Sequence, residues 1–168
     1  MGGKDAAYKR NEVAAQWGEK LAKLQKEQGC YEHKVTIYPE MGHWMKKKDA
    51  EAVPWMATKT RKAWPQKVIW GKSGKRSERF YWLGGKPKDV VIASVKGQEI
   101  VIKGAGKTPL TLFLNDKLLD LDEPVKVFLD DKEVYNGKVA RTQEAIQQSF
   151  KQRLDPEMAA TAIISLKK

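Results

Sequence analysis

Residues 90–103, VVIASVKGQEIVIK, decide the fold of the larger part of this chain. Val90–Val95 and Glu99–Lys103 are short, largely apolar runs of the length and composition typical of β-strands. Lys96-Gly97 between the two runs is a tight-turn signal. The stretch therefore predicts two strands joined by a short turn.

Similar short runs extend on both sides of this pair, and we predict strands at each of them. Asp130-Asp131 and Asn136-Gly137 supply further turn signals. One helix, about Thr142–Leu154, interrupts the pattern, with Thr142 as its N-cap. Many short strands with regular turns favour a β-sandwich-like domain with one helix over residues 65–168. The other predicted strands are Lys67–Trp70, Arg79–Leu83, Leu110–Leu114, Val125–Leu129, Glu133–Tyr135 and about Ala160–Leu166.

A different pattern precedes the boundary at Arg61–Pro65. Residues Tyr8–Gln28 predict an amphipathic helix that ends at Gly29, and the alternating run Tyr31–Tyr38 predicts a strand. A loop that contains His43 and Trp44 follows, and then a short helical segment begins at about Asp49. The helix is expected to bury one apolar stripe, which consists of Val13, Trp17, Leu21 and Leu24.

The composition sets broad limits on the class of protein. The 168 residues are 41% hydrophobic and 32% charged, as in a soluble globular chain, and no apolar run could span a bilayer. We therefore expect no membrane partner. Cys30 is the single cysteine, so no disulfide can form within the chain, and the first residues lack the apolar core of a signal peptide. The compartment is left open.

Asp5 and His43 occur in an order that matters for catalysis. Asp5 lies in a loop before a predicted helix, and His43 lies in the loop after the next predicted strand. The segments around them are GGKD at 2–5, YKRN at 8–11, GHWM at 42–45 and DAE at 49–51. With these segments, the arrangement resembles the C-terminal end of serine esterases and peptidases of the α/β-hydrolase superfamily. The later strands, beginning with RFYWL at 79–83, resemble a β-rich extension that some large bacterial members carry.

The resemblance implies an α+β chain. Residues 1–62 would be a helix-strand-helix remnant of the α/β-hydrolase catalytic domain, followed by the β-sandwich-like domain. Asp5 would orient the imidazole, His43 would act as general base and then general acid, and Trp44 would pack beside them. Taken singly, Asp5 fits a helix cap or turn and His43 fits an exposed loop histidine. Their order and their flanking residues together favour the catalytic pair. His33 lies within the predicted strand, and we expect it to have a structural role.

The nucleophile of that family is missing from the sequence. It belongs in a G-x-S-x-G turn between a strand and a helix, and none of the five serines has this setting. An acid and a base cannot form an acyl-enzyme alone, so we expect the chain to be inactive by itself. It is then either the C-terminal part of a serine hydrolase for ester or peptide substrates, or a free-standing protein. In the second case the β domain or a second copy in a homo-oligomer covers its apolar faces.

The basic stretch at residues 61–88 supports the competing class, a β-sandwich module that binds a glycan or a polyanion. Nine Lys or Arg and one acid give this stretch a net charge of +8, out of +11 for the chain, and aromatics lie between them. We favour core positions for these aromatics, and nucleic acid is disfavoured because no RNA-binding signature accompanies the charge. Gly71-Lys72-Ser73 and Gly106-Lys107-Thr108 lack the spacing of a phosphate-binding loop. No metal site and no cofactor is expected.

Overall fold

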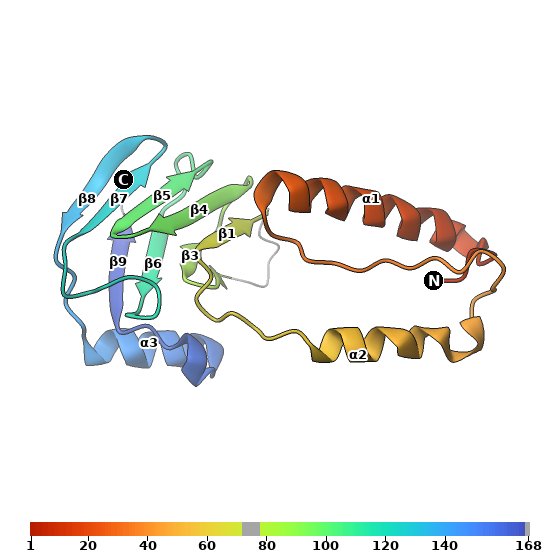
Figure 1. The fold of residues 1–168 in the computed structure, drawn as a ribbon. Helices are drawn as coiled ribbons and strands as arrows, with labels where there is room; N and C mark the ends of the chain where they lie inside the picture. The colour runs from red at the N-terminus through yellow and green to blue at the C-terminus, as the bar shows by residue number, and fades with distance from the viewer. Residues whose placement is uncertain (72–77, 167–168) are drawn as a thin grey trace. The chain divides into compact units, whose positions relative to one another are not determined.

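The computed structural model describes residues 1–71 and 78–166, which form two compact units. Unit 1 is Met1–Thr60 and unit 2 is Arg61–Lys168. The fold of the described residues is mixed α+β, with two sheets of mostly antiparallel strands in unit 2 (Figure 1). The α-helices are α1 (Arg10–Gln28), α2 (Ala52–Ala57) and α3 (Gln143–Arg153).

Unit 2 contains two sheets, and their strand orders place non-consecutive strands side by side. The five-stranded sheet has the order β1-β4-β5-β7-β8, in which only the pair β5 and β7 is parallel. The four-stranded sheet has the antiparallel order β2-β3-β6-β9. The strands are β1 (Lys67–Trp70), β2 (Arg79–Phe80), β3 (Leu83–Gly85), β4 (Val91–Lys96), β5 (Glu99–Lys103), β6 (Leu110–Leu114), β7 (Val125–Leu129), β8 (Lys132–Gly137) and β9 (Ala162–Leu166).

Apolar side chains from both sheets pack into one core. Ile100 and Val127 from the first sheet and Leu112 from the second are fully buried members of it. Trp82, between β2 and β3, is the largest fully buried side chain, and its indole N–H donates to the carbonyl of Pro65 at 2.7 Å. This one bond satisfies the polar atom of the indole, so the ring is buried without an unpaired donor.

The predicted strand Arg79–Leu83 is wrong as one continuous strand. Phe80 pairs with Leu83 in a tight hairpin, and Tyr81 has a left-handed backbone with φ of 52°. The turn is closed by Arg79, whose Nε donates to the carbonyl of Tyr81 at 2.8 Å. Alternation alone could not reveal this turn, because RFYWL contains neither Gly nor Asn nor Pro.

Arg79 also fixes α3 and the chain that follows it. The helix begins as predicted, because Thr142 Oγ1 accepts a bond from the amide of Ala145 at 3.0 Å. Buried Arg79 donates to the carbonyl of Ser149 at 3.1 Å and to that of Met158 at 2.8 Å. Burial, more than the charge of Arg153, lowers the pKa of Arg79 to about 10, so it remains a cation at neutral pH.

Asp116 and Arg141 give unit 2 a pH-dependent contribution to stability. Two guanidinium nitrogens of Arg141 donate to Asp116, and this bonding lowers the pKa of the carboxyl group below 3.8. A carboxyl group with a lower pKa in the folded state stabilises the fold above its unfolded-state pKa, and this stability is lost as the pH falls through the folded-state value. We expect the Tm of Asp116→Asn to lie below wild type at pH 7 and the two Tm values to converge below pH 3.8. The control is Asp89→Asn, which removes an exposed carboxylate and should change the Tm little at either pH. A Tm difference between Asp116→Asn and wild type that persists at the same size at low pH would contradict this linkage.

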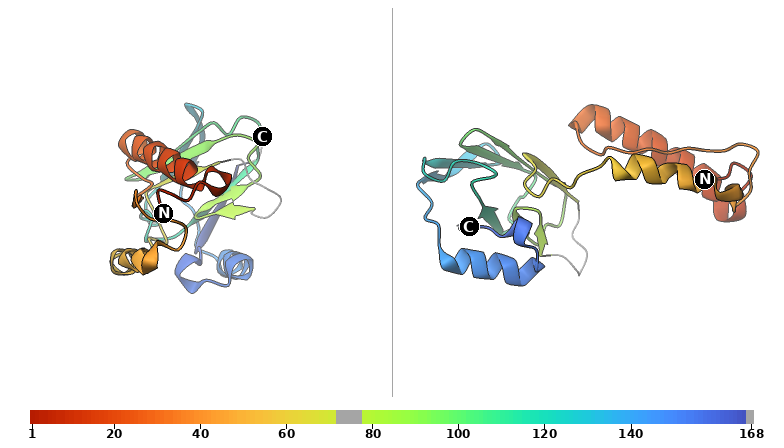
Figure 2. Two further views of the ribbon diagram at one scale, coloured as in Figure 1. Left: turned by 90° about the vertical axis from the view of Figure 1, so that its right-hand side faces the viewer. Right: turned by 60° about the horizontal axis from the view of Figure 1, so that its bottom comes forward.

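Unit 1 is built around α1 and an extended segment, residues 31–38, that runs beside it (Figures 1 and 2). The helix begins at Arg10 rather than Tyr8, because Tyr8 and Lys9 have left-handed backbones, and it ends at Gly29 as predicted. The predicted strand Tyr31–Tyr38 is wrong over most of its length. Only Tyr38 forms a bridge, parallel to Gly2, and the N-terminal ammonium of Met1 donates to the carbonyl of Thr36 at 2.9 Å.

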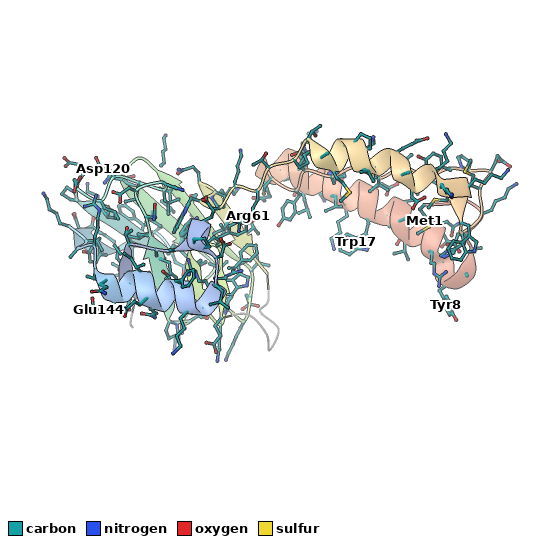
Figure 3. All side chains as sticks on the ribbon, turned by 90° about the horizontal axis from the view of Figure 1, so that it is seen from below. Met1, Tyr8, Trp17, Arg61, Asp120 and Glu144 are labelled. Carbon is teal, nitrogen blue, oxygen red and sulfur yellow. The ribbon has the colours of Figure 1, made fainter. Side chains whose placement is uncertain are left out.

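The predicted apolar stripe of α1 is only half correct. Leu21 and Leu24 are half-buried, but Val13 and Trp17 are 44% and 50% exposed. Trp17 projects from the surface of the unit in Figure 3. The contact with the extended segment is made instead at Gly18, where an added Cβ would lie 3.3 Å from Cβ of Val35. Of residues 1–60, only Gly2 and Asp5 are buried, so unit 1 has no apolar core.

Candidate functional site

The start of the chain is held against the loop that follows the extended segment. The amide of Gly3 donates to the carbonyl of Tyr38 at 2.7 Å, and the amide of Lys4 donates to that of Met41 at 2.9 Å. Gly2 permits this approach, because a Cβ at that position would lie 2.1 Å from the carbonyl oxygen of Gly42. These contacts place the backbone of Asp5 beside the loop that carries His43.

Asp5 and His43, which are far apart in the sequence, form a hydrogen-bonded pair. Nδ1 of His43 lies 2.8 Å from Oδ2 of Asp5. The Asp5 side chain is 3% exposed, whereas the His43 side chain is 53% exposed. An ionised carboxylate can only accept, so the shared proton belongs to Nδ1 of His43. In the neutral ring, Nε2 then keeps its lone pair and can accept a proton from another group.

Arg10 is a third member of this site that the sequence analysis missed. Its Nη1 lies 3.8 Å from Oδ1 of Asp5 and 3.5 Å from Nδ1 of His43. The guanidinium therefore provides a positive charge beside the carboxylate oxygen that His43 does not use. The available signal was its position in the first turn of α1, five residues after Asp5, where its side chain can reach back to the preceding loop.

Two exposed aromatic side chains flank these polar groups. The ring of Trp44 contacts the His43 ring edge-on, with centroids 5.1 Å apart, and Trp44 is 86% exposed. The Arg10 guanidinium lies 5.3 Å from the ring centroid of Tyr8, which also projects from the surface (Figure 3). Such large apolar surfaces are unusual in solvent and are typical of sites that contact another group.

The backbone near the site contains two runs with positive φ. One is Tyr8-Lys9, and the other is Met45-Lys46-Lys47, directly after Trp44. A left-handed backbone costs a residue with a side chain about 1–2 kcal/mol. Strain of this kind gathers at functional sites, where the surrounding contacts hold it in place.

Unit 1 holds the pair but contains no serine. Three of the five serines are described, and all three belong to unit 2: Ser94 on β4, Ser149 in α3 and Ser165 on β9. Ser149 is buried, and its Oγ donates to the carbonyl of Ile146 or Ala160. Ser73 and Ser77 lie outside the described residues. Unit 1 therefore brings together an acid and a base, and its own residues include no serine nucleophile.

The aromatics of the basic stretch 61–88 lie in the core or pack against it where the structure describes them, which agrees with the core interpretation. Trp70 and Trp82 are buried, and Phe80 stacks on Trp70 with centroids 6.0 Å apart. Trp64 is partly buried, packs against the same core and donates to the carbonyl of Glu157 at 2.8 Å. Residues 72–77 of this stretch lie outside the described part.

Metal sites, membrane spans and phosphate-binding loops are the other kinds of feature considered in the described residues. No three His, Cys, Asp or Glu side chains gather there into a metal site. Among the helices described, none is long and apolar enough to cross a membrane. Gly106-Lys107-Thr108 is followed by Pro109 and β6 rather than by a helix, and Gly71-Lys72-Ser73 lies partly outside the described residues.

Comparison with protein families, with curated proteins and with solved structures finds no match for this chain. The geometry of Asp5, His43 and their neighbours, together with the sequence resemblance, is therefore the basis for proposing a function.

Proposed function

We propose that residues 1–62 are the acid-base end of a serine hydrolase that cleaves an ester or a peptide bond. In this proposal Asp5 orients His43, and His43 transfers the proton. The observation that carries the proposal is the 2.8 Å hydrogen bond from Nδ1 of His43 to the buried carboxylate of Asp5. A serine hydrolase needs this bond to fix the tautomer in which Nε2 is the base.

The chemistry of each step follows from the two side chains. His43 Nε2 removes the proton from a serine hydroxyl as its oxygen attacks the substrate carbonyl. The imidazolium that forms is stabilised by the negative charge of Asp5. It then donates the proton to the leaving alcohol or amine. The serine and the donors that stabilise the oxyanion come from polypeptide outside these 168 residues, and the β domain shapes the substrate entrance or holds the catalytic domain.

The backbone of unit 1 also supports the proposal. Gly2 and Tyr38 form a parallel bridge, and α1 lies in the chain between them. Parallel strands require a crossover connection of this kind, and it is usually a helix. Asp5 and His43 follow the two bridged segments on the carboxyl side, where sites form in α/β sheets.

The uncovered apolar side chains of unit 1 agree with a missing part of the domain. Val13 and Trp17 on α1 and Val53 and Met56 on α2 are 44–63% exposed. In the proposed enzyme the rest of the catalytic sheet and its helices cover such surfaces. If the chain functions without that part, a second copy covers them instead.

The isolated 168-residue chain should not hydrolyse p-nitrophenyl acetate faster than buffer. An acid and a base without a nucleophile cannot form an acyl-enzyme, so the rate should equal that of the matched His43→Ala chain. The release of p-nitrophenol measures both rates. Turnover by the wild-type chain that His43→Ala abolishes would overturn this expectation.

The tautomer of His43 is a second expected result that this chain can report. The ¹H–¹⁵N correlations of its ring should show the proton on Nδ1, and Asp5→Ala should remove that preference because the acceptor is gone. His33 is the internal control, since its Nδ1 lies 2.9 Å from the carbonyl of Tyr31 and should not respond. A neutral His43 protonated at Nε2 in the wild-type chain would contradict the proposed role.

A further inference from the structure

Unit 2 contains a cavity that the hydrolase proposal does not use. Its volume is about 540 Å³, and two loops line it, one between β3 and β4 and the other between β5 and β6 (Figure 1). Lys86 and Lys88 belong to the first loop, and Lys107 belongs to the second. Two segments that are separate in the sequence therefore bring three cationic side chains to one hollow.

The charge of this cavity is only partly compensated. Among the described residues of its lining, Asp89 is the single acidic one. Nζ of Lys86 lies 2.5 Å from a carboxylate oxygen of Glu78. Lys88 and Lys107 have no ion-pair partner within residues 1–71 and 78–166. Cations that share a cavity repel one another, and a bound anion relieves that repulsion.

The backbone holds the two loops in a fixed relation. The amide of Gly104 donates to Oδ1 of Asp130 at 2.8 Å, and a Cβ at Gly104 would lie 2.3 Å from the carbonyl oxygen of Val90. Gly104 and Gly106 both have positive φ, and the space beside Gly106 is open. This close approach fixes the second loop against the start of β4, so the cavity exists before a ligand arrives.

We propose that this cavity binds a multiply charged anionic group, a phosphate or a cluster of carboxylates, through Lys86, Lys88 and Lys107. Lysine ammonium groups bind such anions as point charges. The described residues that line the cavity include no aromatic ring, so a charged group is a better ligand than a ring that needs stacking. The group can belong to a free anion or to an acidic polymer. The inference is independent of the proposed hydrolase.

Pyrophosphate titrated into the full chain at low salt, followed by ¹H–¹⁵N NMR, tests the proposal. We expect shifts at Gly104–Thr108 and an affinity that falls as salt is added. The double variant Lys88→Ala/Lys107→Ala should bind about tenfold more weakly. Its matched control is Lys96→Ala/Lys126→Ala, which removes the same charge from outside the cavity and should stay within about twofold of wild type.

An oligogalacturonate in the same titration identifies the source of the anion. Tighter binding than pyrophosphate, with the same loss in the first variant, indicates a charged group on a polymer, and weaker binding indicates a free anion. Equal losses in both double variants would show nonspecific charge attraction and overturn the proposal. Failure of both probes to bind would overturn it as well.

Discussion

Replacing His43 by alanine is expected to lower kcat for ester hydrolysis by about 10⁴–10⁶-fold in a longer polypeptide that joins this chain to a serine nucleophile, as the proposed function requires. In the proposed mechanism His43 takes the serine proton, and Arg10, whose Nη1 lies 3.5 Å from Nδ1 of His43, cannot replace it because a guanidinium does not act as a base. Initial rates with p-nitrophenyl acetate at saturating substrate measure the change in kcat.

Two further variants separate this role from a structural one. Asp5→Asn keeps the size of the side chain but can donate as well as accept, so it should lower kcat by about 10⁴-fold through the wrong tautomer. His33→Ala is the matched control, because the hydrogen bond of His33 goes to the carbonyl of Tyr31 rather than to Asp5, and its kcat should stay close to wild type. If His43→Ala retained a tenth or more of the wild-type kcat, His43 would not be the general base.

The second large effect concerns stability. Trp82→Ala should lower the free energy of unfolding of unit 2 by about 3–5 kcal/mol, since it leaves a cavity between the sheets and an unpaired carbonyl at Pro65. Such a loss is a large part of the stability of a typical domain. Urea unfolding, followed by circular dichroism at about 220 nm under the same conditions for every variant, measures the free energy of unfolding.

Val90→Ala is the control for this substitution. Val90 is 53% exposed, so removing its two methyl groups should change the free energy of unfolding by no more than about 0.5 kcal/mol. A loss of less than about 1 kcal/mol in Trp82→Ala would mean that the indole does not hold the two sheets together.

Much of unit 2 could be predicted from the sequence because its local and tertiary preferences agree. Strands β1, β5, β6 and β7 have the predicted bounds, and Thr142 caps α3 as expected. The hairpin at Tyr81 could not be predicted, since its turn depends on a bond from the buried Arg79. That bond depends in turn on the position of α3, which no local pattern contains.

Unit 1 shows where the same reasoning fails. The pattern of Tyr31–Tyr38 indicates a strand, but pairing requires neighbours, and only Tyr38 forms a bridge, to Gly2. The spacing of the α1 stripe predicts burial, yet Trp17 is half exposed, with the ammonium of Lys20 over its ring. The order of Asp5 and His43 in the sequence indicates a pair. The position of Arg10, whose Nη1 lies 3.8 Å from Oδ1 of Asp5, depends on the folded loop and is not indicated by any sequence pattern.

The sequence of the gene immediately upstream of the Met1 codon tests the proposed hydrolase most directly. The proposal predicts an open reading frame, continuous with Met1, that encodes several strands and a G-x-S-x-G turn. A stop codon in that frame with a ribosome-binding site beside Met1 would contradict it. Asp5 and His43 would then be a hydrogen-bonded pair without a nucleophile on the same polypeptide.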